Sequence, residues 1–442
     1  MSTAFLLVLF GSLIFYRACK WPRVSHSGLL ANSFFMISYL MMLIPSAVFL
    51  EFFGRSIYQN KIVDTSLLWI SISLFSLSVG MFFARFVPRI KINITKFRGR
   101  EVRPSWMVIL FISVPFVLLG FYYLVSFNAT QILNTMLSGN IVEAYVYRTS
   151  ATNALTRHGG FLMLPFKVIF PFLFVYSLLA WQRSRKSGYL LLSILSFIFS
   201  ASYTVLMVQK YYLVQMVLFA GFAYVLDKNI KITFLKFISL LVFLIFSISM
   251  LVMLYVGYSK ERIISIPLNI VERIFLVNYQ TLPSYVSYYF DHPLLYGESF
   301  PNILHLLPYT PVYLTKEISY LYSMTETQIS SGVVGSTPTN FIAELIINFH
   351  YLGGIIGGII LGFLIGYVQK LFICLQVHPK EYHPSIITFY SYIVVISFEV
   401  AAGSAFNYLH YLTVFNLNIL IVAVLSYIIL NLGRLRCSGL LK

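Results

Sequence analysis

Charged residues are scarce in this chain: only 10% of its 442 residues are Asp, Glu, Lys or Arg, whereas soluble domains carry about a quarter. Hydrophobic residues make up 59% of the chain. A water-soluble fold could not hide that many, because any compact body leaves much of its surface exposed. The composition therefore excludes an ordinary soluble protein and favours a membrane protein, whose apolar faces are solvated by lipid.

Acidic residues are scarcer still, since the chain has 14 of them and only three are Asp: Asp64, Asp227 and Asp291. No Asp-x-Asp occurs, and metal-dependent glycosyl transfer usually needs paired carboxylates, so we expect no metal site. A Walker loop, a dinucleotide fingerprint and a Gly-x-Ser-x-Gly elbow are also missing, so we expect no cofactor. Any reaction must then use a substrate that carries its own leaving group.

Continuous hydrophobic runs of about 20 residues, the length of a membrane-spanning helix, recur along the whole chain. A transmembrane β-barrel would show shorter, alternating segments. The sequence predicts an all-α, polytopic integral membrane protein with about eleven transmembrane helices. The predicted spans are approximately 2–16, 29–53, 65–87, 105–126, 161–180, 189–208, 211–226, 237–257, 340–369, 386–405 and 411–432. One alternative stays open: the pair 189–226 forms a re-entrant hairpin around Gln209 and Lys210.

Basic residues gather in alternate connections between these spans. Those connections hold 21 of the 31 Lys and Arg residues and three acidic residues, Glu101, Asp227 and Glu381. Because Lys and Arg are retained in cytoplasmic loops, this asymmetry predicts a periplasmic N-terminus and a cytoplasmic C-terminus. The basic residues are not interleaved with base-stacking aromatics, so no nucleic-acid partner is predicted. The three Cys residues fall on the cytoplasmic side, where thiols stay reduced.

Two outward connections are too long to be mere turns. Residues 1–257 are predicted to hold helices 1–8 with the outward loop 127–160, residues 258–339 to form a large, structured periplasmic loop, and residues 340–442 to hold helices 9–11. The large loop is rich in Tyr, Leu, Ile and Pro, which predicts interfacial helices. One such helix is expected from Pro267 to Tyr279, with Pro267 in its first turn.

Arg262 and Arg273 lie in this loop, eleven residues apart, which returns to nearly the same face of a continuous helix. Two guanidinium groups at a membrane surface suit a diphosphate, because Arg offers planar, permanently charged, bidentate donors. The other interpretation is that both bind lipid headgroups or the neighbouring Glu261 and Glu272.

Three further cationic or basic side chains are candidates on the outward side. His158 in the first loop is either a proton acceptor near neutral pH or an ordinary surface residue. Arg148 lies in the same loop. Lys210, on a short outward turn, is either a phosphate ligand or an interfacial anchor whose amine reaches the headgroups.

Glu344 and Asn348 are four residues apart, hence on one face of the helix entering the membrane. A carboxylate within a membrane helix is costly and usually faces a polar cavity, which makes it a site candidate. The alternative is a helix N-terminal acid stabilised by the helix dipole. Further along, Gly354, Gly358, Gly362 and Gly366 form a smooth stripe that predicts close helix packing.

Three segments resemble the O-antigen (oligosaccharide repeat-unit) polymerases. They are Tyr289-Phe-Asp-His-Pro-Leu-Leu-Tyr-Gly-Glu-Ser-Phe300, Gly335-Ser-Thr-Pro-Thr, and Ala343-Glu-Leu-Ile-Ile-Asn-Phe-His-Tyr-Leu-Gly353. Some members carry an Arg–ten residues–Gly motif, and Arg148 to Gly159 has that spacing, but Arg273 leads to Ser284. The family often has Gly after the Asn-Phe pair, where this chain has His350.

The resemblance implies a metal-independent glycosyltransferase of the bacterial inner membrane. A growing glycan on undecaprenyl diphosphate would be moved onto a single lipid-linked repeat unit at the periplasmic face. Besides these lipid-linked oligosaccharides, the implied partners are membrane lipids and a chain-length regulator protein. The expected roles are proton acceptor for His158 or Glu344, diphosphate binding for Arg262, Arg273, Arg148 and Lys210, and sugar binding for Asn348, Tyr289, Tyr296 and Asp291.

Three other functions stay open. An O-antigen ligase uses the same donor but transfers the glycan to a lipid core. A lipid-linked oligosaccharide flippase or other transporter usually has ionisable groups at mid-bilayer and short outer loops, which fits this chain less well. A non-catalytic membrane scaffold is the third.

Overall fold

The computed structural model describes residues 2–19, 31–88, 106–126, 165–206, 210–230, 260–300, 312–323, 339–373, 379–402 and 417–437, with the single positions 134, 239, 246, 249, 310 and 375. Within these ranges the regular structure is helical and no strand occurs, which confirms the all-α prediction. Arg148 and His158, and nearly all of the loop 127–160, lie outside the described residues.

Helices occupy ten of the eleven predicted segments, and the eleventh, 237–257, lies outside the description apart from three positions. The ten are α1 (Thr3–Cys19), α2 (Ala31–Phe49), α4 (Asn60–Phe86), α5 (Trp106–Ser126), α8 (Phe170–Ser184), α9 (Ser187–Leu206), α10 (Lys210–Lys228), α16 (Phe341–Leu371), α18 (Pro384–Ala402) and α20 (Leu417–Cys437). Two π-helices, η1 (Leu50–Gly54) and η4 (Pro165–Ile169), adjoin α2 and α8, and α3 (Arg55–Ile57) follows η1.

Four stretches are long and apolar enough to cross a membrane, counted over the described part of the chain: Phe35–Ile57, Asn60–Phe86, Pro165–Ser184 and Phe341–Leu371. The total of eleven spans therefore stays a prediction. Helices α9 and α10 have 20 and 19 residues, about 30 Å each, and neither is among these four stretches, so the re-entrant hairpin over 189–226 stays open as an alternative.

Apolar side chains cover the outside of the helices while small polar ones are buried between them. Large exposed residues include Phe10 and Leu13 on α1 and Phe111 on α5. Buried serines on α4 donate to backbone carbonyls three or four residues earlier, as Ser71 does to Leu67. This distribution is the reverse of that in a soluble protein and is that of a membrane protein whose outer surface meets lipid.

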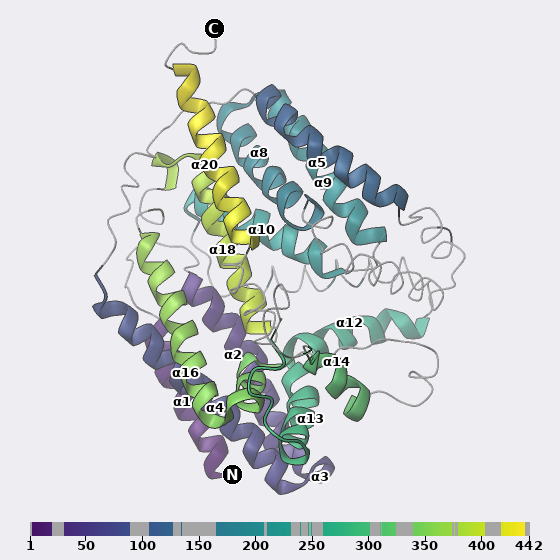
Figure 1. Ribbon diagram of the computed structural model, residues 1–442, viewed down its shortest axis with the longest axis vertical. Helices are drawn as coiled ribbons and strands as arrows, with labels where there is room; N and C mark the ends of the chain where they lie inside the picture. The colour runs from purple at the N-terminus through teal and green to yellow at the C-terminus, as the bar shows by residue number, and fades with distance from the viewer. Residues whose placement is uncertain are drawn as a thin grey trace.

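The helices form two bundles, each with its own core. The first bundle comprises α1, α2, α4, α16 and α13 (Val277–Asp291), and the second comprises α5, η4, α8, α9, α10, α18 and α20. In Figure 1 the second bundle occupies the upper part of the view and the first the lower part. Contacts between α2 and α18 join them.

The predicted glycine stripe is confirmed as a packing surface, because it lets α16 lie directly on α4. A Cβ added at Gly358 would overlap Ser76, and one at Gly362 would overlap the backbone of Leu77. Helix α4 also contributes a glycine to this contact, because a Cβ added at Gly80 would overlap the backbone of Ile359 on α16. Close backbone approach through small residues is a common way of packing membrane helices.

The prediction of one continuous helix over 340–369 is wrong, because α16 doubles back at Phe349 and His350. A Cβ at Gly354 would lie 2.7 Å from Ile346 Cγ1, although those residues are about 12 Å apart in a straight helix. We call Phe341–Asn348 the short arm and residues 351–371 the long arm. The long arm, with 21 residues, spans about 31 Å, whereas the short arm covers about 12 Å.

The short arm begins deep in the first bundle. Asn340 caps its N-terminus, accepting a hydrogen bond from Ile342 N. The Tyr39 hydroxyl donates to Asn340 Oδ1 over 2.8 Å, and Asn340 Nδ2 lies 3.4 Å from Ser73 Oγ. Because Tyr39 and Ser73 are midway along α2 and α4, the short arm starts in the middle of the bundle and runs toward the end where α4 begins.

Four helical pieces occupy the segment predicted as a large loop: α12 (Lys260–Phe275), α13, α14 (Leu314–Ile318) and η6 (Ser319–Ser323). The helix predicted from Pro267 to Tyr279 has different bounds, because Pro267 is inside α12 and the chain leaves the helix at Leu276. Figure 1 shows α12 lying crosswise to α13. Its C-terminal end is tied to α2, where Ser46 Oγ donates to Phe275 O over 3.2 Å.

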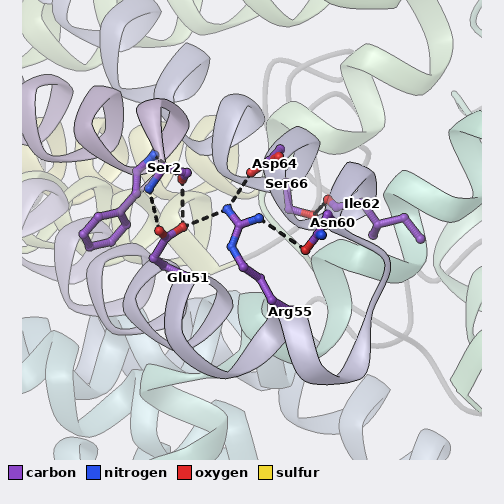
Figure 2. A network of polar contacts seen from close by, with 8 residues as sticks. Ser2, Glu51, Arg55, Asn60, Ile62, Asp64 and Ser66 are labelled. Atoms are coloured by element: carbon purple, nitrogen blue, oxygen red, sulfur yellow. Dashed lines mark hydrogen bonds and ion pairs between the residues drawn. The ribbon is translucent and has the colours of Figure 1, made fainter.

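The two ends of the first bundle differ in charge. At the end where α4 begins, Glu51 accepts hydrogen bonds from the Ser2 backbone and hydroxyl, and Arg55 bridges Glu51 at 3.1 Å and Asp64 at 2.7 Å (Figure 2). At the opposite end, Arg85 donates to Ala18 O. Lys370 of α16 donates to the carbonyls of Arg85 and Val87 at the same end. Helices α4 and α16 therefore each contribute one cation to this end of the bundle.

Candidate functional site

A short loop covers the C-terminal end of the short arm. The backbone amides of Leu295 and Tyr296 donate to the carbonyls of Ile347 and Asn348 over 3.2 and 3.0 Å. The Gly297 amide donates to Asn348 Oδ1 over 2.9 Å. These bonds satisfy carbonyls that the end of a helix leaves without partners. We call the loop 295–300, bound in this way, the clamp.

The clamp depends on a bend that favours glycine. Gly297 has φ +98°, a conformation that side chains with a Cβ rarely adopt. The bend brings Ser299 under the loop, where its side chain is fully buried. The sequence Tyr296-Gly-Glu-Ser299 therefore fixes how the clamp meets the short arm.

Three buried side chains form a directed chain of hydrogen bonds beneath the clamp. Asn348 Nδ2 donates to Ser299 Oγ over 2.7 Å, and Ser299 Oγ donates to Glu344 Oε1 over 3.1 Å. Asn348 Nδ2 also donates to the Glu344 carbonyl over 2.8 Å, as the predicted four-residue spacing requires. Since a serine has one O–H, its donation to the carboxylate leaves its oxygen free to accept from the amide.

Glu344 is only 1% exposed, so the carboxylate is enclosed by protein. Tyr285 on α13 lies close to it; burial chiefly, and the Glu344 charge secondarily, raise the pKa of Tyr285 well above its usual value. Tyr285 is therefore neutral at physiological pH. A carboxylate buried this deeply costs free energy unless hydrogen bonds offset it, which is the role that Ser299 fills here.

Aromatic side chains gather beside the clamp. The Tyr289 ring lies 5.6 Å from Trp69, 5.8 Å from His350 and 6.2 Å from Tyr351, measured between ring centroids. We call Tyr289, Phe290, His350 and Tyr351 the aromatic cluster. Tyr296, whose backbone is bonded to Asn348, is 76% exposed. The buried Trp69 indole N–H has no hydrogen-bond partner in the described part of the chain.

Two acidic residues, Asp291 at the end of α13 and Glu317 on α14, accept hydrogen bonds from tyrosines. Tyr322 donates to Asp291 Oδ2 over 2.8 Å, and Tyr288 to Glu317 Oε1 over 3.4 Å. Burial, reinforced by these carboxylates, raises the pKa of Tyr322 and of Tyr288 to about 12. Both phenols are thus neutral donors, and Asp291 is exposed but already accepts a hydrogen bond.

The structure brings together four of the predicted site residues, Glu344, Asn348, Tyr289 and Tyr296. Asp291 is the last residue of α13, the helix that carries Tyr289. Asn348 is fully buried, and its amide holds the clamp in this conformation. Arg262 and Arg273 are on α12 and Lys210 begins α10, but their side chains lie outside the description. The predicted diphosphate site is therefore untested.

Sequence reasoning missed Ser299, Gly297 and His350. Ser299 and Gly297 stood inside the segment Tyr289–Phe300 that carries the resemblance, yet only a contact with Glu344 gives Ser299 a role. His350 was noted only as a departure from glycine. Its left-handed backbone is the signal that the sequence could not supply.

A second polar feature lies in the second bundle. A small cavity, large enough for about one water molecule, is lined by Lys167 on η4, Gln215 on α10 and Tyr392 on α18, with apolar neighbours. Lys167 is inside the candidate span Pro165–Ser184. Ionisable groups within a membrane helix commonly mark a pathway or binding site, and π-helical turns are frequent at such sites.

Over the described ranges, no three His, Cys, Asp or Glu side chains gather closely enough to hold a metal ion. No family model matches this chain, and neither a curated protein nor a solved structure is significantly similar to it. The likeness to O-antigen polymerases thus stays a prediction that depends on the three segments quoted above.

Proposed function

We propose that this protein is an inner-membrane glycosyltransferase that polymerises undecaprenyl-diphosphate-linked oligosaccharide repeat units on the periplasmic face. The observation that carries the proposal is the buried Asn348–Ser299–Glu344 chain, set beneath a clamp and beside the aromatic cluster. A carboxylate fixed in this way at the end of membrane helices is costly, which favours a functional reason for keeping it.

The aromatic cluster suits a sugar substrate. The face of an aromatic ring is negative and attracts the weakly positive C–H bonds that a sugar ring presents. Tyr322 donates its O–H to Asp291, so its phenol oxygen remains to accept a hydrogen bond from a sugar hydroxyl. In this proposal Tyr289, Tyr296 and Asp291 line the sugar path, whereas Asn348 acts by holding the clamp.

The donor's diphosphate is assigned to cations of the outward segments. Arg262 and Arg273 on the crosswise helix α12 would stabilise charge that develops on the leaving diphosphate, and Arg148 and Lys210 are further candidates for the same role. No metal or nucleotide is needed, because the diphosphate lipid is itself the leaving group.

The charge pattern supports the proposed orientation. Arg85 and Lys370 lie at the end of the first bundle opposite Glu51 and Asp64. By the positive-inside rule we infer a cytoplasmic basic end, and hence a periplasmic clamp and N-terminus.

The test is incubation of the purified protein in lipid nanodiscs with synthetic undecaprenyl-diphosphate repeat units, without nucleotide or metal. We expect a ladder of products. Glu344→Gln should reduce the ladder, and Ser202→Ala, which removes a hydroxyl bonded only to its own helix at Ile198, should leave it unchanged. A wild-type protein that forms no ladder would contradict the proposal.

An O-antigen ligase is the nearest alternative, and gel patterns of the lipopolysaccharide separate the two. Loss of a polymerase leaves one-repeat caps on the lipid core, whereas loss of a ligase leaves none.

The cavity at Lys167 favours a transporter as the alternative of another class. An amine within a membrane helix beside Gln215 and Tyr392 suits an anion or a proton crossing the bilayer. Lys167→Met would then abolish movement of a fluorescent lipid-linked oligosaccharide across proteoliposomes. Under the polymerase proposal the same variant should still form the ladder.

A further inference from the structure

His350 has a backbone conformation that is ordinarily reserved for glycine. Its φ is +57° and its ψ is −170°, directly after Phe349 at φ −132° and ψ 24°. Arg185 also has a positive φ of 58°, but its ψ of 17° is close to the left-handed helical basin that other residues occasionally enter. The combination at His350 is strained by the Cβ that glycine lacks.

Glycine is common in this part of the chain, so its absence from the strained position 350 calls for an explanation. The long arm places glycine at Gly353, Gly354 and Gly357, where a Cβ would contact the short arm. Glycine would likewise suit the turn itself, yet the turn carries an imidazole. Strained residues of this kind persist mainly where the side chain has a use, and they cluster at functional sites.

The His350 side chain is held in a defined place and reaches solvent. It is exposed, and its ring centroid lies 4.6 Å from that of Tyr351, nearly perpendicular to it. Two residues earlier, Asn348 is fastened to the clamp by its carbonyl and its side chain. Glu344, in contrast, is enclosed, so a substrate in the aromatic cluster meets the imidazole rather than the carboxylate.

We propose that His350 is the catalytic residue that accepts the proton of the attacking sugar hydroxyl. This inference rests on the proposed glycosyl transfer and replaces His158 and Glu344 in that role. The hydroxyl oxygen forms a bond to the anomeric carbon of the donor while the bond from that carbon to the diphosphate oxygen breaks. The electron pair of that bond leaves with the lipid diphosphate, and the proton moves to an imidazole nitrogen and then to solvent.

His350→Gly separates this role from a structural one. Relief of strain should raise Tm, because glycine fits the turn, whereas loss of the base should reduce the rate of ladder formation by at least about 100-fold. His350→Asn, which tolerates a left-handed backbone but is no base, should lose the same activity. Because the position is exposed, added imidazole should restore part of the activity of His350→Gly.

The matched control is His292→Asn, since His292 is a second histidine nearby, stacked on Tyr288 at 4.1 Å, and it should keep wild-type activity. The proposal is overturned if His350→Gly keeps activity within tenfold of wild type, or if its activity falls together with Tm and imidazole restores none. An inactive wild type would overturn the glycosyl transfer and the role of His350 together. An active wild type with an active His350→Gly would overturn only the role of His350.

Discussion

The two bundles differ in how their helices pack. In the first bundle, backbones touch through glycine and serine on α4 and α16, and the polar clamp closes the short arm of α16. In the second, the core is aromatic and aliphatic, and the ion pair of Arg183 and Asp227 lies where α8 and α10 end. The comparison indicates that the first bundle positions the clamp by close backbone packing, whereas the second is joined by an ion pair where α8 and α10 end.

The largest effect is expected where the first bundle is most tightly packed. In Gly362→Leu the new side chain would meet the backbone of Leu77, which cannot move aside as a side chain can. We expect a loss of more than about 3 kcal/mol, the top of the usual range for overpacking, measured by unfolding in detergent. Gly221→Ala is the control, because no atom lies within 4 Å of that Cβ, and it should not destabilise the protein.

Asp227→Ala should weaken the second bundle next most strongly. Arg183 Nε donates to Asp227 Oδ1 over 2.9 Å, and the two side chains are 13% and 2% exposed. Removing one partner of a buried pair costs about 3–5 kcal/mol, and we expect about 3 because Arg183 retains the Tyr382 carbonyl at 2.7 Å. Thermal unfolding measures the loss. If the double variant Arg183→Met/Asp227→Ala were no more stable than Asp227→Ala, the ion pair would not be the cause.

The stability of the second bundle should also decrease in acid, because of the buried His383, which lies just before α18. Burial chiefly, and the Arg183 charge secondarily, lower the pKa of His383 to about 4. The Ser385 amide donates to Nδ1 over 3.3 Å, which requires the neutral ring. Between pH 6.5 and 4 the unfolded chain binds more protons than the folded one, so stability falls with falling pH in that window.

The acid effect is at most about 3 kcal/mol, the free energy that corresponds to a histidine pKa of about 4 in the folded protein and about 6.5 in the unfolded chain. Unfolding curves at pH 4, 5 and 7 measure it. His383→Gln should flatten the pH dependence; a variant that kept the wild-type slope would show that another group titrates.

Ser299→Ala should have the smallest effect on stability and a clear effect on the clamp. It removes the donor to Glu344 and the acceptor for Asn348 within a buried site, which costs about 1–3 kcal/mol. Hydrogen exchange at the amides of Tyr296 and Gly297 should become faster. Unchanged exchange would mean that the backbone bonds alone hold the loop.

Much of the fold could be predicted because it follows from composition and periodicity. The predicted span 340–369 begins within one residue of Phe341, and the glycine stripe and the pairing of Glu344 with Asn348 are as expected. The turn at His350 could not be predicted, because neither glycine nor proline stands at the break and the glycines that follow, Gly353 and Gly354, fit the packing stripe of a straight helix equally well. Pro267 was misplaced because α12 begins in the polar stretch Lys260-Glu-Arg262, before the apolar pattern becomes clear.

The fold-back of α16 is the claim on which the clamp, the site and the role of His350 depend, and a disulfide between its two arms tests it directly. In a background where Cys19, Cys374 and Cys437 are replaced by Ala, we would introduce Ile346→Cys and Gly354→Cys and oxidise the membrane-embedded protein. We predict efficient formation of the 346–354 disulfide, since a Cβ at position 354 lies within 3 Å of the Ile346 side chain. The control pair Ile356→Cys and Leu364→Cys, with the same separation inside the long arm, should not form one. Absence of the 346–354 disulfide would mean a straight helix, with those two residues about 12 Å apart, and would contradict the account.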